Sequence, residues 1–137
     1  MSYGGYMDNK LHGFLIGSDI QVDINNKRLI RVSSGNSDKI LNFSAVVLKD
    51  IVMKLLIYIL TNARDDVVSK EEILKNVWDD NNLSSSNQRL WQVVNELKEK
   101  LSLIGISPDF IVNQRGKGYK VNHSYITPLY YKESNYV

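Results

Sequence analysis

The sequence predicts an α+β domain in which short antiparallel strands come first, helices follow and a β-hairpin closes the fold. Short alternating or apolar segments, separated by turn-rich breaks, occupy residues 14–48. Apolar residues at helical spacing then recur between residues 51 and 104. Finally, residues 110–121 alternate apolar and polar side chains on either side of a glycine-containing turn.

A chain of 137 residues is long enough to bury one core without disulfides or metal, so one domain is expected. Cysteine is absent, which excludes disulfide frameworks, thiol nucleophiles and zinc knuckles and is consistent with a reducing compartment. Residues 1–10 show no periodicity and no signal-peptide pattern. We therefore expect a flexible N-terminus over 1–10, a domain over 11–124 and a tail or linker over 125–137.

The predicted strands cover residues 14–16, 20–24, 28–32 and 39–48. Their breaks are rich in glycine, serine and asparagine, which favour turns. Strands this short, separated by turns this tight, are typical of an antiparallel meander.

The first predicted helix covers residues 51–60 and is the most apolar run in the chain. A membrane span needs about 20 apolar residues. This run is shorter and is interrupted by Lys49, Asp50 and Lys54. We therefore expect a helix buried on most sides, with Asp50 as its N-cap.

The second predicted helix begins at Ser69 and runs through Trp78. Ser69 and Glu72 form a capping box, in which the serine hydroxyl accepts a backbone N–H and the glutamate reaches back. Ile73, Leu74 and Val77 form its core face, and Trp78 is expected in the core.

The third predicted helix covers about Ser85 to Leu103 and has one apolar and one polar side. The apolar stripe consists of Leu90, Val93, Val94, Leu97, Leu101 and Ile104. The polar side carries Gln88, Arg89, Gln92 and Asn95, whose side-chain types pair bidentately with adenine or guanine edges in a DNA major groove. Each alone would suit an ordinary solvated face. Trp91 could pack under the helix, touch a thymine methyl or stack on a neighbour.

The predicted hairpin has Arg115-Gly116-Lys117-Gly118 at its tip. Two glycines permit a tight turn, and two basic side chains there suit phosphate groups. The formal net charge of the chain is only +2, but the charge is unevenly distributed. Residues 84–120 contain six basic and three acidic side chains, whereas residues 65–83 contain six acidic and two basic side chains.

An enzyme would need convergent polar groups, and the sequence offers none at motif spacing. His12 and His123 stand near opposite ends of the chain without an acidic partner at such spacing. Carboxylate pairs, phosphate-binding glycine loops and metal-spaced clusters are likewise missing from the sequence. We expect no catalytic residue, no metal and no cofactor.

With these motifs in place, the chain resembles the winged helix-turn-helix effector domains of OmpR/PhoB-type bacterial regulators, and most closely their membrane-tethered ToxR/CadC-like relatives. The likeness rests on residues 48–59, 67–78 and 90–119. It implies a four-stranded N-terminal sheet, three helices and a C-terminal wing, with the third helix in the major groove. It also implies phosphate or wing contacts from Ser69, Lys70, Lys98, Arg115 and Lys117.

The resemblance further implies a transcriptional activator that binds double-stranded promoter DNA and works beside RNA polymerase. Asp79, Asp80 and Asn82 would face the polymerase, although a solvated acidic loop is an equal alternative. A homodimer or a partner regulator is a further expected partner. Two contexts stay open, a stand-alone regulator and the cytoplasmic part of a membrane-tethered one; in both the chain is cytoplasmic and does not itself contact the membrane.

Three departures from the family pattern bear on affinity. Lys98 replaces the usual arginine, Glu96 would repel a phosphate, and Asn113-Gln114 replaces Thr-Val before Arg115. Weak DNA binding by the isolated domain, rescued by dimerisation or a partner, follows as a hypothesis. The alternative function is a winged helix that binds a partner regulator or RNA polymerase instead of DNA.

Overall fold

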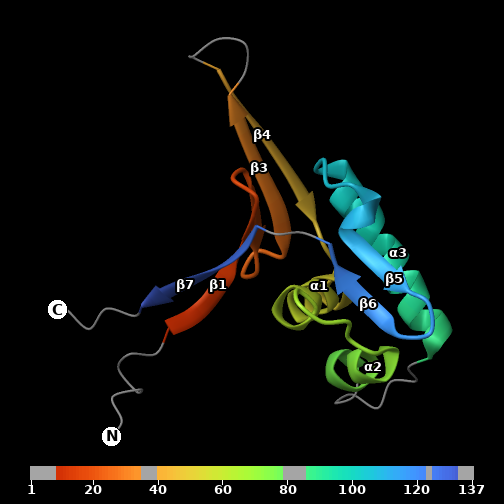
Figure 1. Ribbon diagram of the computed structural model, residues 1–137. Coiled ribbons are helices and arrows are strands. Elements are labelled where there is room, and N and C mark those ends of the chain that lie inside the picture. Colours follow the sequence, from red (N-terminus) through yellow and green to blue (C-terminus); the bar gives the residue numbers. More distant parts are fainter. Residues whose placement is uncertain (1–8, 35–39, 79–85, 123–124, 133–137) are drawn as a thin grey trace, which may run out of the picture.

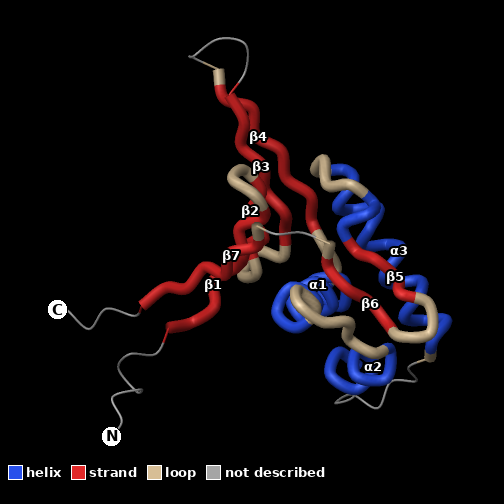
Figure 2. Tube along the Cα trace, viewed as in Figure 1, coloured by secondary structure: helices blue, strands red, loops and turns tan. Residues whose placement is uncertain are grey.

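The computed structural model describes residues 9–34, 40–78, 86–122 and 125–132. A curved antiparallel sheet lies on one side of the molecule, and three helices with a two-stranded hairpin lie on the other (Figures 1 and 2). The predicted α+β winged-helix architecture is thus confirmed. The elements, in chain order, are β1 (Asn9–Ile16), β2 (Ile20–Asp23), β3 (Arg28–Ser34), β4 (Leu41–Val47), α1 (Asp50–Asn62), α2 (Lys70–Trp78), α3 (Asn87–Leu103), η2 (Pro108–Phe110), β5 (Ile111–Gln114), β6 (Gly118–Val121) and β7 (Ile126–Lys132).

The large sheet has five strands in the order β4-β3-β2-β1-β7, one more than predicted. The extra strand is β7, which pairs antiparallel with β1 along its length. The predicted tail or linker from residue 125 is therefore wrong for Ile126–Lys132, and the flexible start predicted for 1–10 is wrong for its last two residues. Ile126 and Pro128 face Ile16 and Phe14 of β1, a pairing that local periodicity could not reveal.

The inner face of the sheet carries buried residues of three strands, among them Phe14, Val22 and Leu29. Asp23 is also buried, and it organises the turn between β2 and β3. Its carboxylate accepts hydrogen bonds from the Asn26 backbone N–H and side-chain amide and from Arg28 Nε. Burial by itself raises the pKa of Asp23, but these hydrogen bonds outweigh it and hold the pKa below its ordinary value.

α1 is the central helix: six of its thirteen residues are buried and three more are partly buried against the core, in agreement with the helix buried on most sides that the sequence predicted. Leu55, Leu56 and Ile59 have no exposed surface. The predicted cap is wrong: Lys49 is the N-cap, and Asp50 is the first helical residue, where its carboxylate pairs with Lys27 at 2.6 Å. An acid in the first turn interacts favourably with the helix dipole without accepting a capping hydrogen bond.

No helix in the described part of the chain combines the length and apolar character needed to cross a membrane.

α2 and α3 begin at serine caps. The Ser69 hydroxyl accepts the Glu72 N–H at 3.1 Å, which confirms the serine half of the predicted capping box, and the Ser86 hydroxyl accepts the Arg89 N–H at 3.0 Å. All six predicted apolar residues of α3 and its following turn are buried, and so is Trp78. α3 is described from Asn87, so Ser85, the predicted start, lies outside the described residues.

Candidate nucleic-acid interface

The exposed side of α3 carries three amide side chains on one stripe. Gln88, Gln92 and Asn95 are exposed and stand four and three residues apart, which places them one above another on a helix surface. Arg89 is exposed beside them, one turn before Gln92. The opposite side of α3 packs into the core, so this polar side is the one available to a ligand.

Trp91 belongs to the same exposed surface. Its side chain is 59% exposed, so it does not pack under α3. It stands three residues after Gln88 and four before Asn95, next to both. Of the three roles that the sequence left open, this exposure excludes packing under the helix and leaves contact with a thymine methyl and stacking on a neighbour.

Glu96 stands four residues after Gln92, beside the amide stripe, and has a cationic partner. Its carboxylate lies 3.3 Å from Lys49 Nζ, at the N-cap of α1. An exposed pair of this kind contributes little to stability. It nevertheless partly neutralises the acid whose charge was expected to repel a phosphate. Lys98, two residues on, is half-buried rather than freely extended.

The hairpin of β5 and β6 is the predicted wing. Its turn closes with a hydrogen bond of 2.9 Å from the Lys117 N–H to the Gln114 carbonyl, and Gly116 adopts a positive φ of 78°. Arg115 and Lys117 are exposed at the tip. The geometry thus places both predicted wing cations where a DNA backbone could reach them.

The start of α2 lies against the wing, an arrangement that sequence spacing did not reveal. Val68 and Tyr119 exchange two backbone hydrogen bonds of 2.9 Å each. Gly118 makes this possible: a Cβ there would lie 1.9 Å from the Val68 carbonyl oxygen. The only sequence signal was the second glycine of the turn, which serves close approach as well as turning.

This junction brings predicted phosphate ligands from two elements together. A hollow of about 200 Å³ lies between the first turn of α2 and the wing, lined by Lys70, Glu71, Gly116, Lys117 and Gly118. Two lysines border it, and the N-terminus of α2 adds a partial positive charge. Glu71 opposes them. Ser69 lies at the same end, but its hydroxyl already caps the helix.

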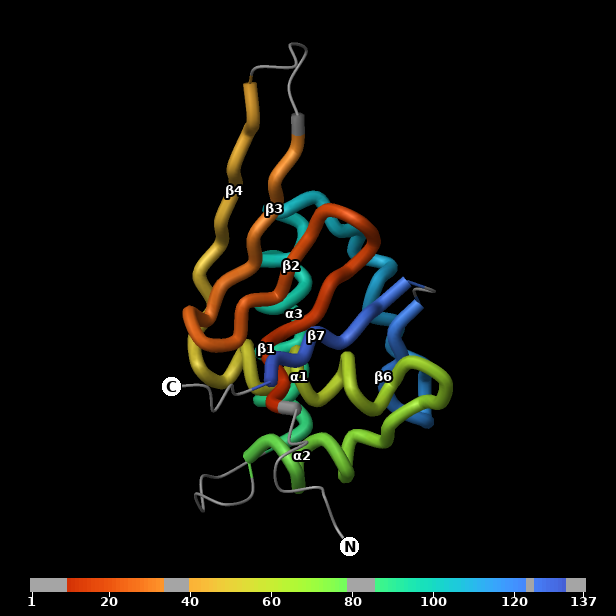
Figure 3. Tube along the Cα trace, turned by 90° about the vertical axis from the view of Figure 1, so that its left-hand side faces the viewer, coloured from red at the N-terminus to blue at the C-terminus, as the bar shows by residue number. Residues whose placement is uncertain are grey.

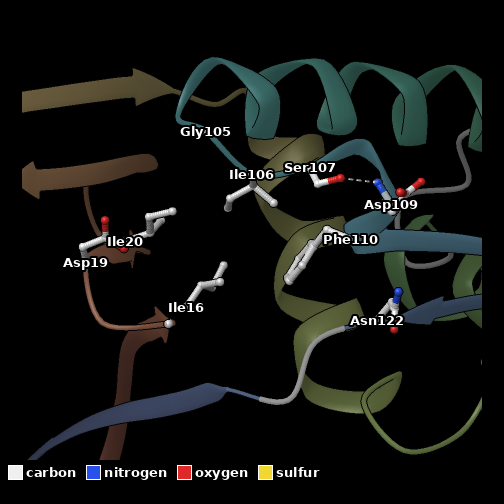
Figure 4. A pocket seen from close by; sticks show the side chains of 10 residues that line it. Ile16, Asp19, Ile20, Gly105, Ile106, Ser107, Asp109, Phe110 and Asn122 are labelled. Carbon is white, nitrogen blue, oxygen red and sulfur yellow. Dashed lines mark hydrogen bonds between the residues drawn. The ribbon is translucent and has the colours of Figure 1, made fainter.

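A second pocket of about 420 Å³ adjoins the C-terminal end of α3 (Figure 4). Ile16, Ile20, Ile106 and Phe110 contribute apolar surface to it. Of its two acids, Asp19 accepts from Arg31 Nε at 3.0 Å, and Asp109 is exposed, with its backbone N–H donating to the Ser107 hydroxyl. The amide stripe is in the other half of α3, so this pocket is separate from the polar surface.

The predicted polymerase-facing residues Asp79, Asp80 and Asn82 lie outside the described residues. Within the part of the chain that the structure does describe, no group of three or more histidine, cysteine or carboxylate residues could hold a metal ion.

A three-helix core with one exposed polar helix face beside a basic wing defines the winged helix-turn-helix class of DNA-binding domains. A family model described as "Transcriptional regulatory protein, C terminal" matches residues 44–121, which is more than half of the chain. The chain belongs to this family, that of the OmpR/PhoB-type winged-helix domains. It is therefore a DNA-binding domain of a transcriptional regulator, a class defined by binding rather than by catalysis.

Solved structures share the fold. The DNA-binding domain of CadC from E. coli superimposes with a TM-score of 0.63 at 20% identity, over 90% of this chain and 99% of that one. The AdeR DNA-binding domain, solved in complex with an intercistronic region, superimposes with a TM-score of 0.59 at 18% identity, over 79% of this chain and 98% of that one. The C-terminal domain of the nisin resistance regulator NsrR superimposes with a TM-score of 0.52 at 26% identity, over 82% of this chain and 94% of that one. A search of curated proteins gave no match.

Proposed function

We propose that the chain binds promoter DNA sequence-specifically, with α3 in the major groove and the wing on the backbone or in the adjacent minor groove. One observation carries the proposal: the exposed amide stripe of α3 lies in the same domain as a basic wing tip joined to the N-terminus of α2. Amide side chains read bases, whereas cations and helix N-termini bind phosphates.

Gln88, Gln92 and Asn95 are the proposed base-reading residues, because a glutamine or asparagine can pair with both N6 and N7 of adenine. Arg89 would pair with guanine O6 and N7 from the neighbouring stripe. Trp91 adds exposed apolar surface that fits a thymine methyl. This surface predicts discrimination between base pairs, not only attraction to charge.

Arg115 and Lys117 are the proposed wing cations, and Ser69 and Lys70 the proposed phosphate contacts at the start of α2. Lys98 would reach a phosphate from the side of α3 by extending its half-buried stem. The Lys49–Glu96 ion pair supports close approach of the DNA, since it reduces the negative charge beside the stripe.

The biological role that we propose is transcriptional activation beside RNA polymerase. Asp79, Asp80 and Asn82 would contact the polymerase. A cytoplasmic setting follows from this role, and the fold shared with CadC is compatible with either a tethered or a stand-alone regulator.

The proposal is tested by binding of the chain to a pool of duplex DNA, followed by affinity measurements on the selected sequence at several salt concentrations. Arg115→Ala removes a wing cation and is compared with Lys132→Ala, which removes one cation from β7. A phosphate contact predicts weaker binding and a shallower salt dependence for the first variant only.

Gln92→Ala then separates base reading from charge. It is expected to weaken binding to the selected sequence by roughly tenfold, in keeping with a base contact of about 1–3 kcal/mol, while leaving binding to unrelated duplexes unchanged. If no sequence is enriched and affinity does not fall as salt rises, the DNA proposal is overturned and a partner-binding role takes its place.

A further inference from the structure

The outer edge of the large sheet is β4, and it is both unpaired and apolar. Among the described strands, β4 pairs only with β3, so its second edge has free backbone N–H and C=O groups. Figure 3 shows this strand along the margin of the molecule. Six of its seven residues are exposed, and Leu41, Phe43 and Val47 are 71%, 61% and 70% exposed.

These apolar side chains share one face of the strand. Side chains alternate along a strand, so Leu41, Phe43, Ala45 and Val47 point the same way. The opposite face is the inner one, because Val46 pairs with the fully buried Leu29. The register sets Phe43 beside Val32, itself 45% exposed, and Ala45 beside Ile30. Together these residues form an apolar surface on the outer face, which we call the β4 surface.

The two edges of the sheet differ in how they resist pairing. β7, at the opposite edge, contains Pro128, which has no N–H to donate, and ends at Lys132. β4 contains no proline, glycine or charged residue. Two cations on β3 lie beside it, Arg28 opposite Val47 and Arg31 opposite Ser44. They are paired with Asp23 at 3.2 Å and with Asp19 at 3.0 Å. Features that oppose pairing with another chain are therefore present in β7 and missing from β4.

We propose that β4 is the docking edge for a second copy of this chain, which pairs with it antiparallel about Ser44. This register sets Leu41 opposite Val47 of the second copy and Phe43 opposite Ala45. On the outer face, apolar residues therefore pair only with apolar residues. On the inner face Ser44 pairs with Ser44 and Asn42 with Val46, and no charge meets a like charge. The self-complementarity of the sequence LNFSAVV about its central serine carries the choice of a second copy over another partner.

The two-fold axis of such a dimer passes between the two paired copies of β4. Pairing of these strands joins the two sheets into one. The inner faces, with their helices, then lie on the same side of the joined sheet. If the chain also binds DNA as proposed above, a two-fold dimer predicts an operator with inverted half-sites. The dimer itself does not depend on DNA and is tested without it.

The register is tested by cysteine cross-linking, because the chain has no cysteine of its own. Ser44→Cys sets two thiols directly opposite each other across the axis, within the Cα separation of about 4.4–6.8 Å that a disulfide needs. Asn42→Cys is the matched control on the same strand and face. In the proposed register, the two copies of residue 42 are offset by four residues, or about 14 Å, which is too far for a disulfide.

Under mild oxidation we expect Ser44→Cys to give a covalent dimer and Asn42→Cys to stay monomeric. In the cysteine-free chain, sedimentation is expected to show a concentration-dependent dimer. Phe43→Lys should abolish that dimer, whereas Tyr130→Lys on the β7 edge should leave it unchanged, with circular dichroism as the check on folding. Equal cross-linking at both positions, cross-linking at residue 42 alone, or a monomer that persists at high concentration would each overturn the proposal. Each of these outcomes is separate from failure to bind DNA.

Discussion

The junction between α2 and the wing provides the sharpest test of the structure, through Gly118. This residue adopts a φ of 141°, and a Cβ on it would lie 1.9 Å from the Val68 carbonyl oxygen and 2.9 Å from Ser69 Cα. These atoms belong to the backbone, so they cannot rotate away as a side chain could. Gly118→Ala must therefore move the wing away from the start of α2.

The expected cost has two parts. An unfavourable backbone conformation costs about 1–3 kcal/mol for a residue other than glycine. Separating Val68 from Tyr119 also loses two backbone hydrogen bonds, which contribute about 1–3 kcal/mol together. The sum of about 2–6 kcal/mol is a large part of the total stability of a small domain, about 5–15 kcal/mol.

Gly116→Ala is the matched control in the same turn. Its φ of 78° is also positive, but no atom lies within 4 Å of a Cβ placed there. Urea unfolding followed by tryptophan fluorescence measures both variants, with buried Trp78 in α2 as the principal reporter. We expect Gly118→Ala to be the less stable of the two by at least about 1 kcal/mol, the value of one lost hydrogen bond. Equal loss of stability in the two variants would refute the role assigned to the junction.

Three further predictions concern single side chains. Removing the helix cap with Ser86→Ala should lower the free energy of unfolding by about 1 kcal/mol in the same urea assay, whereas Ser86→Thr should retain most of the stability. Asp23 has a lowered pKa in the folded state, so its ionised form stabilises the fold at pH values above the ordinary carboxyl value of 3.8, and this contribution disappears as the pH falls through the folded pKa. The Asp23→Asn variant should therefore be most destabilised, relative to the parent chain, near neutral pH. A difference in unfolding free energy between the two proteins that does not shrink in acid would contradict this. In salt titrations of DNA binding, Arg115→Ala should reduce the slope by about one unit, and an unchanged slope would show that Arg115 contacts no phosphate.

Much of the fold could be read from local patterns. The buried stripe of α3, the serine cap of α2 and the turn at Gly116 all follow from interactions within a few residues of the chain, and the structure confirms them. Strand β7 could not be predicted in this way. Its polar and aromatic residues show no clear period, and its place is decided by pairing with β1, more than one hundred residues earlier.

The features of the candidate interface also fall into two groups, those that local patterns predict and those that only the folded chain brings together. The sequence by itself determined that α3 has an amide-bearing polar side and that two cations stand at the wing tip, because helical spacing and turn chemistry are local properties. Only the tertiary structure decided that Glu96 meets Lys49, that Gly118 lets the wing contact the start of α2, and that β4 is an edge strand of the sheet that the described residues form. These features depend on residues brought together from distant parts of the chain, and burial of the shared core, rather than any local pattern, sets their geometry.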